Sequence, residues 1–268
     1  MTRGASRTLT ATRYVVALRE GGSVPAVVEA DDGALWVVKL RGSAQGGRVL
    51  AAEMIVGELA RAAGLRVPAL AVIDVDAAIG RSEPHQEIRE GLLRSVGSNL
   101  AMAYLAGAVG YDVAAKVPMA GDVASRIVAL DMFAANVDRT ARNPNLLWWQ
   151  GELWLIDHGA SLTWHHGWEG GAGSRRDDAL ASSAAKVFAH VADHVLLRFA
   201  DRLPEAGAAL AAAFDDATLA RAVDAVPDAW LDGAGAELRA AYMTWLRARR
   251  AALPAIVEEA ERVRAARV

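Results

Sequence analysis

Short runs of apolar residues, many of them β-branched, fill the first hundred positions and are separated by turn residues, which is typical of β-strands. The pattern predicts strands at residues 14–18, 24–30, 35–40, 67–75 and 100–105. The first three are joined by short turns, so we expect them to form an antiparallel meander. Between the third and fourth strands, apolar residues recur every three or four positions and predict a helix over residues 48–63, ended by Gly64.

Beyond residue 122 the spacing of apolar residues is mostly helical. It predicts helices at residues 124–135, 177–199, 203–214, 218–225, 233–253 and 254–267. One hairpin interrupts them, with strands at residues 146–149 and 153–156 and a turn at Gly151. The pattern changes near Gly107 and Gly110, which predicts two parts, residues 1–107 and 108–268. The expected fold class is α+β, with a small antiparallel β part followed by a mostly helical part.

Composition and charge exclude several classes of protein. The 268 residues are 53% hydrophobic and 23% charged, which indicates a globular chain, and a net charge of −3 gives no basic field for nucleic acid. No cysteine is present, so disulfides and thiolate catalysis are excluded, and a reducing cytoplasm is expected. We find no signal peptide, and the longest apolar stretch is too short to span a membrane. The high content of Ala, Arg and Gly suggests a bacterial source.

Three polar residues around the hairpin have a spacing that suits phosphoryl transfer. Asp138 precedes Asn143 by five residues, and Asp157 follows fourteen residues later between an apolar pair and Gly159. Enzymes that transfer the γ-phosphoryl group of ATP use one carboxylate to orient the nucleophile, and an amide and a second carboxylate to hold Mg²⁺. These residue types therefore predict ATP and Mg²⁺ as ligands, with Asp138 catalytic.

The hairpin explains why the two metal ligands should meet. Pro144 keeps Asn143 extended, and the two strands that follow fold back on each other. Asn143 at the start and Asp157 at the end would then reach one metal ion. An Asn and an Asp in such places are also ordinary turn formers, and that alternative stays open.

A second pair of residues lies in the β-rich part. Lys39 ends the predicted strand of residues 35–40, where its ammonium group could meet phosphates in a cleft. Glu53 lies fourteen residues later on the predicted helix, where it could pair with Lys39. Each could instead be a solvated charge at the end of a strand or on the face of a helix.

A glycine-rich loop is expected to cover the phosphates with its backbone N–H groups. The first candidate comprises Gly21, Gly22 and Ser23, and the second is the segment of residues 42–47. The sequence contains neither a G-x-G-x-x-G nor a Walker motif, so the glycines in both places could simply form turns.

Taken together, the chain resembles the HipA-like kinase family, which shares the broad fold of protein kinases and phosphatidylinositol kinases. The matching segments are Trp36-Val37-Val38-Lys39, Leu50-Ala51-Ala52-Glu53, Gly64-Leu65-Arg66-Val67-Pro68, Asn136-Val137-Asp138-Arg139 with Asn143-Pro144-Asn145, Ile156-Asp157-His158-Gly159 and Val226-Pro227-Asp228-Ala229-Trp230-Leu231. In length the chain is similar to the short, stand-alone members of the family.

The resemblance implies a two-lobed fold with ATP between the lobes and a Ser/Thr side chain of a protein as the acceptor. It implies that Ala103, Tyr104 and Leu105 contact adenine, and it repeats the roles given above to Lys39, Glu53, Asp138, Asn143 and Asp157. Thr140 stands where many relatives carry His, which affects the acceptor more than ATP binding. The segment of residues 163–176 follows the metal-binding Asp and is expected to face the acceptor.

Two other functions remain open. The chain could bind nucleotide without turnover and act as a pseudokinase that docks a partner. It could also phosphorylate a small molecule, as kinases of the aminoglycoside or choline type do. The complete set of five polar residues favours an active enzyme over the first alternative.

Overall fold

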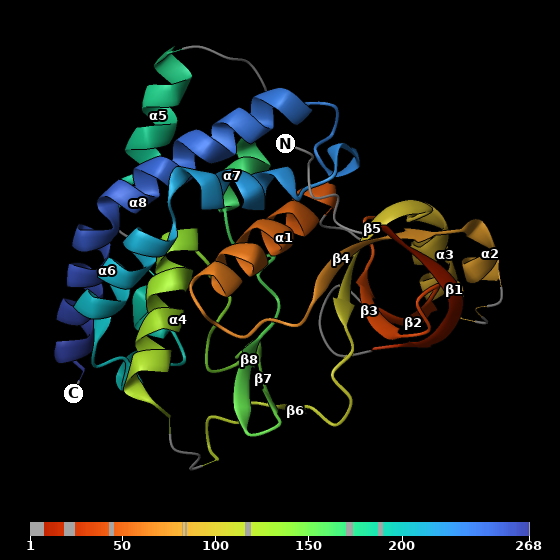
Figure 1. The fold of residues 1–268 in the computed structure, drawn as a ribbon, viewed down its shortest axis with the longest axis horizontal. Helices are drawn as coiled ribbons and strands as arrows, with labels where there is room; N and C mark the ends of the chain where they lie inside the picture. The colour runs from red at the N-terminus through yellow and green to blue at the C-terminus, as the bar shows by residue number, and fades with distance from the viewer. Residues whose placement is uncertain are drawn as a thin grey trace.

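The computed structural model describes residues 8–18, 25–42, 46–81, 83, 85–115, 119–169, 174–186 and 190–267. A β-barrel lies on one side and a group of helices on the other, with a small second sheet between them at the bottom of the view in Figure 1. The strands are β1 (Thr8–Ala17), β2 (Ala26–Ala30), β3 (Leu35–Lys39), β4 (Leu70–Val75), β5 (Gly97–Ala103), β6 (Val109–Gly110), β7 (Leu146–Trp149) and β8 (Glu152–Leu155). The α-helices are α1 (Gly46–Ala62), α2 (Ala77–Arg81), α3 (Gln86–Arg94), α4 (Gly121–Ala134), α5 (Ser174–Ala184), α6 (Leu203–Ala213), α7 (Asp216–Asp224) and α8 (Gly235–Ala265).

The barrel has the strand order β1-β2-β3-β5-β4. β1, β2 and β3 form the predicted antiparallel meander, and β3 pairs next with β5, placing Lys39 opposite Leu100. The prediction of a purely antiparallel sheet is wrong in one respect, because β1 also runs parallel to β4 and closes the sheet. Closure removes the exposed strand edges that an open meander would leave.

The segment between β4 and β5, for which the sequence predicted no helix or strand, contributes α2 and α3. Ile79 of α2 and Leu92 of α3 belong to the same buried apolar cluster as the barrel residues Val28, Val38 and Ile73. Ile88 of α3, partly buried, also packs against this cluster, so both short helices are held by apolar residues that a polar average over the segment conceals.

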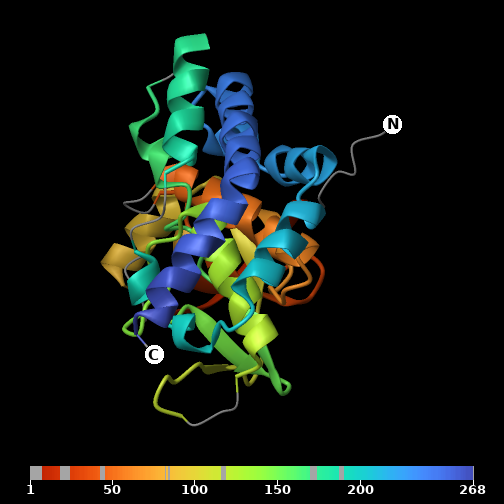
Figure 2. The ribbon, with the colours of Figure 1, turned by 90° about the vertical axis from the view of Figure 1, so that its left-hand side faces the viewer.

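The helical part forms a second apolar core around α4, α6 and α8. Figure 2 shows α8 running along this part of the molecule, past α5 near one end and α6 near the other. The sequence predicted two helices here, but α8 is continuous through Pro254. Leu253 and Ile256 on either side of the proline are fully buried, and their packing maintains the helix across the missing backbone hydrogen bond.

The helix predicted over residues 177–199 is wrong in its second half, because α5 ends at Ala184. Arg249 of α8 donates from Nη1 to the carbonyl oxygens of Ala184 (2.7 Å) and Lys186 (2.8 Å). These bonds satisfy carbonyls that a continuing helix would have used itself. Residues 190–199 contain two short 3₁₀ helices, η2 (Val191–Asp193) and η3 (Leu197–Phe199).

Among the described residues, no helix has the combination of length and apolar character that crossing a membrane requires.

Candidate active site

A cleft of about 1140 Å³ lies between the barrel and the hairpin β7–β8. Its walls come from β1, β3, β5 and the start of α1 on one side, and from β6, β7 and the segments that precede β7 and follow β8 on the other. Seven of the residues predicted from the sequence line it: Lys39, Ala103, Tyr104, Leu105, Asp138, Asn143 and Asp157. The structure therefore brings together side chains that lie up to 118 positions apart in the chain.

Lys39 is the buried end of β3 and points toward two carboxylates. Its Nζ lies 2.8 Å from Oε1 of Glu53 and 2.8 Å from Oδ1 of Asp157. Glu53 is only 1% exposed and lies behind the cleft wall on α1. The ion pair anticipated between Lys39 and Glu53 is present, and Asp157 joins it from the opposite side of the cleft.

The charge of Lys39 stabilises both carboxylates and is stabilised by them, while the two carboxylates repel each other. Burial lowers the pKa of Lys39, but the carboxylates of Glu53 and Asp157 outweigh it and raise that pKa above 10.5. Burial raises the pKa of Glu53, and the charge of Lys39 only partly offsets this. Burial would also raise the pKa of Asp157, yet the ammonium of Lys39 holds it below its usual 3.8. Lys39 is therefore a cation, and Asp157 an anion, at neutral pH.

The helix that carries Glu53 approaches the segment after Asp157 very closely. A Cβ atom placed on Gly159 would lie 2.6 Å from Cγ1 of Val49 and 3.4 Å from Oε2 of Glu53. Only a glycine leaves room for α1 at this point, so Gly159 sets how near Glu53 comes to the cleft.

The β7–β8 hairpin forms as predicted. Leu146 pairs with Leu155, and the N–H of Ile156 donates to the carbonyl oxygen of Asn145 (3.1 Å), so the two ends of the hairpin are adjacent. Asp157 follows with φ = 55°, the left-handed conformation that side chains other than glycine rarely adopt. Such backbone strain clusters at functional sites, where the surrounding fold maintains it.

Asp138 is held by two amides. Nδ2 of Asn143 (2.7 Å) and Nδ2 of Asn145 (3.2 Å) both donate to its Oδ2. This arrangement orients the carboxylate and directs the amide nitrogen of Asn143 toward Asp138, which leaves the amide oxygen for another partner.

Asn143 and Asp157 suit a divalent cation that takes most of its ligands from groups outside the protein. Within the part of the chain that the structure describes, no group of three or more His, Cys, Asp or Glu side chains could hold a metal. Asn143 and Asp157 supply one amide oxygen and one carboxylate. This donor set suits Mg²⁺, which commonly binds through one or two carboxylates together with phosphate oxygens and water.

The comparisons with known proteins agree with this geometry. The family model described as HipA-like kinase matches residues 13–252, most of the chain. The chain belongs to the HipA-like kinase family. Among solved structures, it is similar to the crystal structure of CtkA, a Helicobacter pylori proinflammatory kinase, with a TM-score of 0.54 over 97% of this chain and 99% of that one. The two sequences are 10% identical, so this likeness concerns the fold. No curated protein matches the chain.

Some residues expected at the site of this HipA-like kinase cannot be placed. The predicted phosphate-covering residues Gly21, Gly22 and Ser23 lie outside the described residues, as do positions 43–45 of the alternative loop. Of the segment expected to face the acceptor, residues 163–169 are described. They form the 3₁₀ helix η1 (Thr163–Gly167) and its continuation, to which Arg48 of α1 donates at the carbonyl oxygen of Trp168 (3.0 Å).

His158 follows Asp157 and is buried beside Arg139. Its ring is buried, with Nδ1 3.3 Å from Nη2 of Arg139. Burial first, and then the positive charge of Arg139, lower the pKa of His158 to about 3, so the ring is neutral. The neutral ring therefore packs against the guanidinium group of Arg139.

Three residues of this region were missed by the sequence analysis: Asp131, Arg139 and His194. They form a buried polar network directly behind Asp138. One signal was available, because Asp131 interrupts the otherwise apolar run Ile127–Ala135, and a charge in such a run requires a buried partner. Nothing in the sequence pointed to His194 as that partner, since it lies 63 residues away.

Proposed function

We propose that this HipA-like kinase transfers the γ-phosphoryl group of ATP to a hydroxyl group, with Mg²⁺ as the metal and a Ser or Thr side chain of a protein as the acceptor. The two lobes would be residues 1–107, which contain the barrel and α1, and residues 108–268. The observation that carries the proposal is the convergence of Lys39, Asp138, Asn143 and Asp157 on one cleft, with Glu53 paired to Lys39 behind it.

Each residue would have a distinct task. The ammonium of Lys39 binds the α- and β-phosphates, and Glu53 keeps it in place as the phosphates arrive. Asn143 and Asp157 would hold Mg²⁺, which supplies positive charge at the β- and γ-phosphate oxygens. The backbone at residues 103–105 faces the adenine ring.

Asp138 orients the acceptor. The hydroxyl oxygen attacks the γ-phosphorus, the bond from that phosphorus to the bridging oxygen of ADP breaks, and the hydroxyl proton passes to the Asp138 carboxylate. The two amide donors on Oδ2 leave Oδ1 of Asp138 to accept the hydroxyl hydrogen. Catalysis is then mainly positioning and electrostatic stabilisation.

The deciding experiment follows label from γ-labelled ATP with Mg²⁺, using the purified protein alone and with cell lysate. Label in protein bands supports the proposal, and label only in small metabolites identifies the aminoglycoside-type alternative. Tight ATP binding without any transfer identifies the pseudokinase alternative.

Two substitutions separate metal binding from transfer. We expect Asp157→Ala to remove the Mg²⁺-dependent part of ATP affinity in calorimetry, and Asp138→Ala to abolish transfer while changing that affinity by less than about threefold. Asp224→Ala, at an exposed position of α7, is the control. If the first two variants behaved alike, the assigned division of roles would be wrong.

A further inference from the structure

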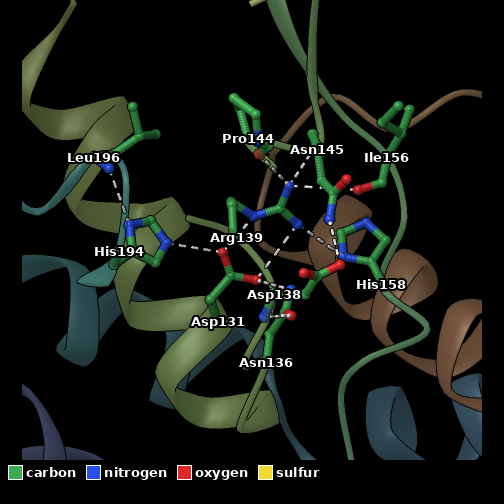
Figure 3. A network of polar contacts seen from close by, with 10 residues as sticks. All are labelled: Asp131, Asn136, Asp138, Arg139, Pro144, Asn145, Ile156, His158, His194 and Leu196. Atoms are coloured by element: carbon green, nitrogen blue, oxygen red, sulfur yellow. Dashed lines mark hydrogen bonds and ion pairs between the residues drawn. The ribbon is translucent and has the colours of Figure 1, made fainter. Parts of the chain in front are cut away.

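The network behind the catalytic residue is closed off from solvent. The side chains of Asp131 and Arg139 are 0% exposed and that of His194 is 4% exposed. Oδ2 of Asp131 accepts from Nε of Arg139 (2.5 Å) and from Nε2 of His194 (3.0 Å), as Figure 3 shows. Two donors thus fix one carboxylate oxygen.

Arg139 carries this fixation to both sides of the cleft. It directly follows Asp138 in the chain, and its Nη1 donates to the carbonyl oxygens of Asn145 and Ile156, the latter at 3.3 Å. Its Nη2 contacts the ring of His158 (Figure 3). Ile156 and His158 flank Asp157. The side chain of Arg139, the residue next to Asp138, therefore contacts both neighbours of Asp157.

The charges in the network balance. Burial would raise the pKa of Asp131, but the guanidinium of Arg139 and the hydrogen bond from His194 hold it well below the usual range. The N–H of Leu196 donates to Nδ1 of His194 (3.1 Å), so this nitrogen carries no hydrogen and the ring is the neutral form with hydrogen on Nε2. Asp131 and Arg139 cancel each other, and His194 supplies a directed donor without adding charge.

The backbone around His194 is also attached to the catalytic segment. The N–H of Val195 donates to the carbonyl oxygen of Arg139 (3.1 Å), and His194 forms an isolated antiparallel bridge with Thr140. The segment that follows α5 therefore lies against the catalytic residues through both its backbone and one side chain.

From this geometry we propose that His194 is a positioning residue for phosphoryl transfer. By donating to Asp131 it holds the carboxylate that orients Arg139, and so it maintains the distance between Asp138 and Asp157. The inference rests on the proposed function, because it gives a task to Asp138 and Asp157, but the network itself is independent of it.

Two substitutions divide the two hydrogen bonds of the ring. In His194→Gln the side-chain amide nitrogen can reach the place of Nε2 and still donate to Asp131. In His194→Asn the shorter amide oxygen can take the place of Nδ1 and accept from Leu196, but residue 194 no longer donates to Asp131, which keeps only its donors from Arg139 and Asn136. His190→Asn, at an exposed histidine just upstream, is the control.

We expect His194→Asn to lower kcat for phosphoryl transfer by about tenfold or more, since small displacements of reacting groups are costly. His194→Gln should stay within about threefold of the wild type, and KM for ATP should change by less than about threefold in both. If His194 only stabilised the fold, kcat would change in step with thermal stability, whichever of the two ring hydrogen bonds was lost. Equal kcat values for the two variants at equal stability would overturn the proposal.

Amide hydrogen exchange tests the role of His194 without requiring phosphoryl transfer. Amides of residues 136–147 and 155–160 should exchange faster in His194→Asn than in His194→Gln or the control. If the wild type transferred no phosphoryl group, the proposed function would fail. The faster amide exchange in His194→Asn would still show that the network through Asp131 holds the two sides of the cleft. Unchanged exchange in His194→Asn would overturn that link even if transfer were normal.

Discussion

Gly159→Ala is the perturbation whose effect the structure defines most closely. The added methyl carbon would lie 2.6 Å from Cγ1 of Val49. Carbon atoms that are not bonded prefer separations of about 3.5–4.0 Å, so α1 and the segment after Asp157 must separate by about 1 Å. The 2.8 Å ion pair between Lys39 and Glu53 would then open beyond hydrogen-bond length.

We expect ATP affinity to fall and kcat for phosphoryl transfer to drop by as much as about 10²-fold, the loss that a displacement of about 1 Å can cause. The free energy of unfolding should fall by about 1–3 kcal/mol from overpacking. Calorimetric titration of Mg²⁺-ATP, release of γ-label and denaturant unfolding measure the three effects separately.

The clash lies at one methyl group, Cγ1 of Val49, so removing that group should restore function. The double variant Gly159→Ala/Val49→Ala should recover most of the lost kcat, and Val49→Ala alone should be nearly neutral for transfer. Gly91→Ala is the matched control, because a Cβ there meets only Cδ1 of Leu40, at an ordinary contact distance of 3.7 Å. A wild-type rate in Gly159→Ala, or a double variant as slow as the single one, would refute the argument.

Two further predictions concern stability. Arg249→Met should lower the free energy of unfolding by about 3 kcal/mol or more in urea titrations, because it leaves buried carbonyls at the ends of α4 and α5 without a donor. The control Arg247→Met, at an exposed position of the same helix, should change this free energy by less than about 1 kcal/mol. Stability should also fall as pH decreases from 6.5 toward 3. The pKa values of buried His158 and His165 are lowered to about 3, chiefly by burial, so between pH 6.5 and 3 only the unfolded state takes up protons at these two rings. Each histidine then lowers the free energy of unfolding by up to about 1.4 kcal/mol per pH unit. Equal unfolding midpoints at pH 7 and pH 5 would contradict this.

Apolar periodicity and turn residues predicted the helices and strands whose formation depends mainly on neighbouring residues. The hairpin that brings Asn143 and Asp157 to one end follows from two apolar runs and a turn at Gly151, and the helix bearing Glu53 follows from its periodicity. The sequence thus placed these side chains in one cleft, while their roles remain predictions.

What the sequence did not reveal depends on long-range packing. Closure of the barrel needs β1 to reach β4, which no neighbouring residue signals. The burial of Arg249 was not predicted, although this residue lies one turn from both Trp245 and Leu253 on the buried side of α8. The end of α5 at Ala184 was also missed, since Arg249 provides its last hydrogen bonds.

The position of α1 determines which part of the molecule can move. In protein kinases the Lys–Glu pair is controlled by the helix that carries Glu. Here α1 packs against α7 and the 3₁₀ helix η4 (Asp228–Trp230), and a Cβ on Gly47 would strike the backbone of Trp230 at 2.7 Å. Glu53 is thereby fixed to the helical part, whereas Lys39 belongs to the barrel. The ion pair therefore joins a strand of the barrel to a helix that packs on the helical part, so a movement that drew the barrel away from that part would break it.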